Sequence, residues 1–127
     1  MINVTNAEVS ASICRDSFYE FVKEFWSTIV PEELVDNWHI KLLCDELQVM
    51  AERVYSWTPS QYDLIVNIPP GTSKSTVTSI MFPAWMLARN PSMRIIVATH
   101  TERLGQNLSL KSRMVVRSEK YQTYSPK

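Results

Sequence analysis

The stretch that most restricts the fold of this chain is DLIVNIPPGTSKSTVTSIMFPAW, residues 63–85. A run of apolar, β-branched residues leads into a Pro-Pro-Gly turn, and Lys74 and Ser75 then open a segment with apolar residues at helical spacing. Such apolar runs are typical of buried strands, and backbone amides at a helix start bind phosphate. The order therefore predicts a phosphate-binding turn between a strand and a helix.

The turn departs from the usual phosphate-loop pattern, G-x-x-x-x-G-K-[ST], in which glycines occupy two fixed positions. Ile68 and Ser73 stand at those positions, and Gly71 lies inside the turn instead. By spacing alone, an ordinary strand–turn–helix with a lysine at the helix start explains the stretch more readily than a nucleotide site does.

Residues 1–60 carry two helical patterns. Ser17 followed by Glu20 forms a capping-box pattern, and apolar residues recur behind it at helical spacing. A second apolar stripe begins near Asn37 and is expected to end before the loop at Pro59. These residues are predicted to form a helical lead-in.

Residues 61–127 carry two apolar runs, LIVNI and MRIIVAT, and a helical pattern follows each of them. The first of these helices is expected to kink at Pro83, because a proline ring removes one helical hydrogen bond. Strands that alternate with helices predict a parallel sheet. We therefore expect an α/β chain in which N-terminal helices precede a β-α-β-α unit with parallel strands.

The net charge of zero hides two opposite halves. Residues 1–63 hold four basic and eleven acidic side chains, whereas residues 64–127 hold nine basic and two acidic ones. This asymmetry indicates either a surface that faces a polyanion or two solvated faces that attract each other. Both explanations remain open at this point.

Composition excludes several classes of protein. No apolar run approaches the roughly 18–20 residues needed to span a bilayer, so no membrane is expected. Cys14 and Cys44 form no CxxC pair, which argues against a metal knuckle or a disulfide framework. We expect a reduced, cytoplasmic setting.

Further segments carry a family resemblance: LIVNIPPGTSKST, FPAW, ARNPSMRIIVATHTERLGQNLSLKSR, EKYQ and, upstream, DNWHIKLLCDEL. In order and spacing, over about residues 18–124, they resemble the N-terminal part of the large terminase subunit of tailed bacteriophages. The resemblance implies a P-loop NTPase domain of the ASCE type, incomplete in residues 1–127, with residues 1–60 as lead-in and residues 61–127 as its βαβα segment. The complete protein would use ATP to drive double-stranded DNA into a procapsid.

The resemblance also implies which residues bind ATP and Mg²⁺. Lys74 would contact the β- and γ-phosphates, and Ser75 would hold the metal. His39, beside Trp38, would lie near the adenine, although a structural histidine is the commoner explanation for such a residue. The implied phosphate-binding residues are Pro70, Gly71, Thr72, Ser73, Lys74, Ser75 and Thr76.

The implied partners are double-stranded DNA, a portal, a small terminase subunit and further copies of the chain, in the cytoplasm of an infected bacterium. Arg113 would lie on a helix related to DNA-contacting motifs, and a solvated helix face explains it equally well. The DNA-binding candidates are Arg103, Lys111, Arg113 and Arg117.

Two departures limit the expected activity. Gly71 stands where many members of the family carry a catalytic arginine, and no later run of four apolar residues ends in Asp-Glu. The nuclease segment of the family is also missing from these 127 residues. We therefore expect ATP binding without turnover. A stand-alone module that binds nucleic acid or a partner, and a helicase-like ATPase fragment, are the alternatives.

Overall fold

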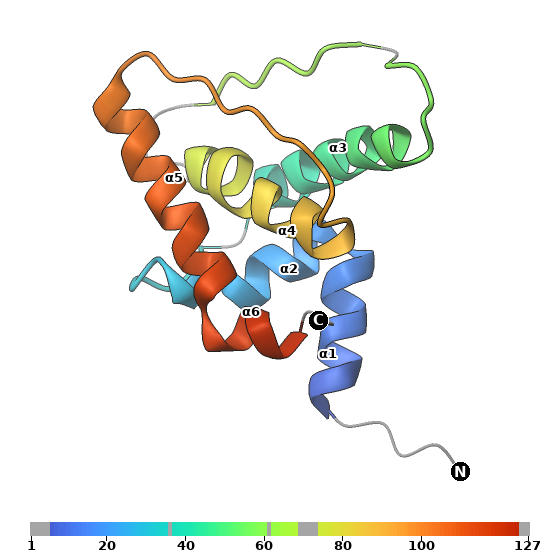
Figure 1. The fold of residues 1–127 in the computed structure, drawn as a ribbon, viewed down its shortest axis with the longest axis vertical. Coiled ribbons are helices and arrows are strands. Elements are labelled where there is room, and N and C mark those ends of the chain that lie inside the picture. Colours follow the sequence, from blue (N-terminus) through green and yellow to red (C-terminus); the bar gives the residue numbers. More distant parts are fainter. Residues whose placement is uncertain (1–5, 36, 61, 69–73, 125–127) are drawn as a thin grey trace.

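A computed structural model describes residues 6–35, 37–60, 62–68 and 74–124 of the chain, and these ranges contain helices joined by loops (Figure 1). The elements are α1 (Asn6–Asp16), α2 (Phe18–Phe25), the 3₁₀ turn η1 (Trp26–Thr28), α3 (Trp38–Tyr55), the π-helical turn η2 (Thr76–Met81), α4 (Phe82–Arg89), α5 (Glu102–Arg117) and α6 (Glu119–Tyr124). None of the described helices is long and apolar enough to cross a membrane.

The predicted α/β fold, a P-loop NTPase domain with a parallel β-α-β-α unit, is wrong, because the described residues form no strand. Residues 62–68 and 94–99 cross the molecule as extended segments (Figure 1). Neither segment forms a backbone–backbone hydrogen bond to any described residue. The described part of the chain is an all-helical domain.

The side chains of the first extended segment, residues 62–68, explain why a strand was wrongly predicted there. Leu64, Val66 and Ile68 are half-buried, whereas Ile65 is 79% exposed, so only alternate side chains contact the helices. A β-branched apolar run shows that a segment suits a pleated surface, but the ladder itself requires neighbouring strands. The described residues supply no neighbouring strand.

The core lies where α2 meets α4 and where α1, α3, α5 and α6 close around them. Phe18 and Trp85 are fully buried, with ring centroids 5.2 Å apart. The indole N–H of Trp85 donates to the Cys14 carbonyl at 2.9 Å, and the Tyr121 hydroxyl donates to the Ala84 carbonyl at 2.9 Å. The buried aromatic residues are thus anchored by hydrogen bonds as well as by packing.

The predicted start of the helix after Ser17 is confirmed, since the Ser17 hydroxyl accepts a hydrogen bond from the backbone N–H of Glu20 at 3.4 Å. Asn37 likewise immediately precedes α3, where the second helical pattern was predicted to begin. Local capping and apolar periodicity therefore predicted the starts of α2 and α3 correctly.

Just before Pro83 the chain makes a π-helical turn, η2. Residues 74–89 form one continuous helical run, in which the backbone N–H of Phe82 donates to the carbonyl of Val77, five residues back. Pro83 follows as the second residue of α4. Because proline has no N–H and crowds the carbonyl four residues back, a locally wider helix lets the run pass it.

Candidate functional site

The predicted phosphate site is described only in part. Pro70, Gly71, Thr72 and Ser73 lie outside the described residues. Lys74 and Ser75 are the first described residues of the helical run that contains η2 and α4, so the predicted helix is present. The predicted strand before the turn is absent, since residues 62–68 form none.

Lys74 is available to a ligand. Its side chain is half-buried and has no hydrogen-bond or ion-pair partner among the described residues. Its carbonyl accepts a 2.7 Å hydrogen bond from the Thr78 hydroxyl, which ties the first turn of the run together. Ser75 is exposed, and Thr76 is half-buried as the first residue of η2. A cation and a hydroxyl thus stand next to each other at the N-terminal end of the described helical run, and a helix N-terminus favours anions.

A hollow lies beside the segment that enters the turn. Its volume is about 260 Å³, and it is bounded by the first turns of α3 and by residues 64–68. Trp38 is 77% exposed and His39 is half-buried, and their rings meet edge to face with centroids 6.2 Å apart. The structure therefore brings Trp38 and His39 against the residues that immediately precede the predicted phosphate turn.

Two polar side chains also line this hollow, namely Glu46 and Asn67. Glu46 accepts a hydrogen bond from the Tyr62 hydroxyl at 3.1 Å, and this bond raises the pKa of Tyr62. Glu46 and Asn67 had not been predicted as site residues. Glu46 stands two turns along α3 from Trp38, but no sequence motif distinguishes it from a solvated helical glutamate.

The four predicted DNA-binding residues share one helix. Leu108 and Val115 bury the inner side of α5, and Arg103, Lys111, Arg113 and Arg117 are exposed. At about 100° per residue, Arg103, Arg113 and Arg117 fall within roughly 80° of one another, with Lys111 on the flank. None of the four has an ion-pair or hydrogen-bond partner among the described residues. Leu110 and Met114, which were not predicted, lie exposed on the same face.

Some basic residues outside α5 do have acidic partners. Four of them are paired with acidic side chains: Lys23 with Glu20, Lys41 with Asp45, Arg89 with Glu52 and Lys120 with Glu24. The positive half of the sequence is therefore not simply neutralised by the negative half, because the α5 cations have no counter-charge among the described residues.

The described residues give little evidence of a metal site or of a reactive Cys14 thiol. They include no group of three or more His, Cys, Asp or Glu side chains placed to bind a metal ion. Ser75 would therefore supply one ligand to a Mg²⁺ ion held mainly by phosphates and water. Burial raises the pKa of the Cys14 thiol to about 11, so this cysteine is not a reactive thiolate.

Comparisons with known proteins do not identify a family. A scan against protein-family models matched none, and searches of curated proteins and of solved structures found no significant match.

Proposed function

We propose that this chain binds ATP through the segment that ends in Lys74 and Ser75, as the N-terminal part of a terminase-like DNA-packaging ATPase. One observation carries the proposal. The hollow that holds Trp38 and His39 lies against residues 64–68, and only five residues of sequence separate Ile68 from Lys74. A base site and a phosphate site would thus lie at the two ends of one short turn.

The chemistry of the two ends suits the two parts of a nucleotide. The exposed Trp38 indole offers a face on which a base can stack, and the Glu46 carboxylate can accept a hydrogen bond from an exocyclic amine. The Lys74 ammonium would pair with the β- and γ-phosphates, and the Ser75 hydroxyl would reach a phosphate-bound Mg²⁺. We propose binding rather than hydrolysis for these residues, because the sequence contains no catalytic Asp-Glu pair after an apolar run.

The remaining parts of the proposal come from the terminase resemblance. In the complete protein, ATP would drive double-stranded DNA into a procapsid. The chain would work as a ring of identical subunits with a portal and a small terminase subunit, in the cytoplasm of the infected bacterium.

Isothermal titration with Mg-ATP tests the nucleotide site. Lys74→Ala should weaken binding at least tenfold, because it removes the cation proposed to contact the phosphates. Lys41→Ala is the matched control, since Lys41 is an exposed lysine already paired with Asp45. No heat with the unmodified chain, or equal losses in the two variants, would overturn the proposal.

A nucleic-acid-binding module is the second candidate, and the unpartnered cations of α5 favour it. If they contact phosphates, the logarithm of DNA affinity should fall with the logarithm of salt concentration, with a slope of about −0.9 for each contact. Arg103→Gln should then make the slope shallower by about one contact, while Lys74→Ala should leave it unchanged. Fluorescence anisotropy with a labelled DNA duplex measures both slopes, and identical slopes for Arg103→Gln and the unmodified chain would reject this candidate.

A further inference from the structure

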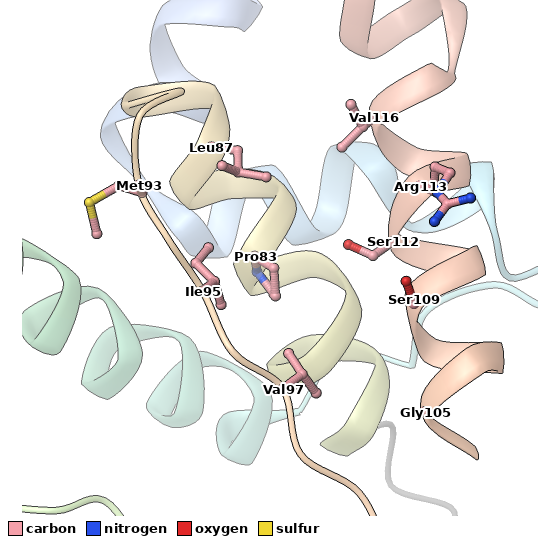
Figure 2. A pocket seen from close by; sticks show the side chains of 10 residues that line it. All are labelled: Pro83, Leu87, Met93, Ile95, Val97, Gly105, Ser109, Ser112, Arg113 and Val116. Atoms are coloured by element: carbon pink, nitrogen blue, oxygen red, sulfur yellow. The ribbon is translucent and has the colours of Figure 1, made fainter. Parts of the chain in front are cut away.

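A second groove, separate from the hollow at Trp38 and His39, lies between α4, the extended residues 93–97 and α5 (Figure 2). Its volume is about 530 Å³. Sites for small organic molecules usually measure about 300–1,000 Å³ and are largely apolar with a few placed polar groups. The apolar side chains that line this groove are Pro83, Leu87, Met93, Ile95, Val97 and Val116.

The polar groups of the groove all come from α5 (Figure 2). Ser112 is already committed, because its hydroxyl donates to the Ile80 carbonyl at 3.2 Å. Ser109 and Arg113 stand one helical turn apart, both are exposed, and neither side chain has a partner among the described residues. Among the described residues, no acidic side chain lines the groove. Its polar wall therefore carries one uncompensated positive charge next to one uncommitted hydroxyl.

Gly105 lets the chain come close to α5 at this groove. A Cβ atom built on Gly105 would lie only 2.8 Å from Oγ1 of Thr99. Because Gly105 has no side chain, Thr99, at the end of the extended segment that contains Val97, can lie close to α5. Because Gly105 itself lines the groove, its backbone amide is a natural reporter of anything bound there.

We propose that this groove binds a small aliphatic carboxylate. The carboxylate would pair with the Arg113 guanidinium and accept a hydrogen bond from Ser109, two groups that lie on the same side of the groove. The hydrocarbon chain would lie along the apolar side chains of α4 and residues 93–97, which are then removed from water. This inference does not depend on nucleotide binding, since the groove shares no lining residue with the Trp38 hollow.

The test is an NMR titration of the ¹⁵N-labelled chain with sodium octanoate, followed through the Gly105 amide. Octanoate should shift Gly105 and its neighbours in a saturable way. Butanoate, which has the same charge and a shorter chain, should bind at least tenfold more weakly because it buries fewer methylene groups. Octylammonium, which has the same chain length and the opposite charge, should not bind.

Two variants separate the Arg113 contact from general charge attraction. Arg113→Met should weaken octanoate binding about tenfold, whereas Arg103→Met, on the same helix but outside the groove, should leave it unchanged. The proposal is overturned if octanoate causes no saturable shift at Gly105, if octylammonium binds as well as octanoate, or if the two variants lose affinity equally.

Discussion

The interior around Trp85 and the exposed face of α5 differ in whether their polar side chains have hydrogen-bond partners. In the interior, the Trp85 indole and the Tyr121 hydroxyl donate to the carbonyls of Cys14 and Ala84. Along α5, four exposed basic side chains stand without partners among the described residues. The difference teaches which groups serve stability and which are available to a ligand: substitutions inside should unfold the chain, and substitutions outside should change binding alone.

The largest expected effect is on the interior. Trp85→Ala should lower the free energy of unfolding by about 3–5 kcal/mol, because it leaves a cavity in the core and an unpaired carbonyl at Cys14. Urea denaturation followed by circular dichroism measures the change. Trp57→Ala is the control, since Trp57 is 94% exposed, and it should change stability by less than about 0.5 kcal/mol. Similar losses in both variants would show that Trp85 is not the anchor of the core.

The exposed face of α5 should show the opposite behaviour. Replacing Arg103 and Arg117 together with glutamine should change the free energy of unfolding by less than about 1 kcal/mol, because neither side chain has a partner to lose among the described residues. Removal of like charges on one face can even stabilise α5 slightly. A large loss in the same urea experiment would mean that these cations are structural, and the comparison between the two regions would fail.

A smaller effect is expected where α2 meets α6. Glu24 Oε1 accepts hydrogen bonds from Lys120 Nζ at 2.8 Å and from the Tyr124 hydroxyl at 3.0 Å. The Lys120 bond is the main reason why the pKa of Glu24 is lowered. A lowered pKa in the folded chain means that this stabilisation is present above the ordinary carboxyl pKa and is lost as the pH falls through the lower value.

Glu24→Gln should therefore reduce the difference between the urea midpoints at neutral and acidic pH. Glu33→Gln, which removes an exposed carboxylate, is the control and should leave the difference nearly unchanged. Because the Glu24 and Lys120 side chains are each about one-third exposed, the effect should be a modest one. Equal pH dependence in both variants would show that the Glu24 contacts do not contribute.

Local signals predicted part of this fold and missed the part that depends on distant neighbours. Ser17 marks the start of α2 because capping is decided within one turn, and the apolar stripe that begins near Asn37 marks the start of α3. Helix α1 was not predicted, because the residues that it buries, such as Ala11 and Cys14, are few and small. The apolar runs at residues 64–68 and 93–99 were assigned to strands, but the pairing of strands is a tertiary property that a run of β-branched residues does not determine.

The candidate site was predictable to a similar degree. The local pattern predicted that Lys74 lies in the helix after the turn, and it also predicted one helix that carries both Arg103 and Arg117. The hollow between Trp38 and residues 64–68 and the groove beside Arg113 could not be predicted in this way, since each is formed by segments that are distant in the sequence.

The central claim is that a base at Trp38 and phosphates at Lys74 belong to one nucleotide. Titration calorimetry of ATP and AMP, each with Mg²⁺, against the unmodified chain, Lys74→Ala and Trp38→Ala tests it most directly. The unmodified chain should bind ATP more tightly than AMP. Lys74→Ala should remove that preference, and Trp38→Ala should weaken both nucleotides by the same factor. If ATP does not bind, or if Lys74→Ala weakens ATP and AMP equally, the claim is contradicted.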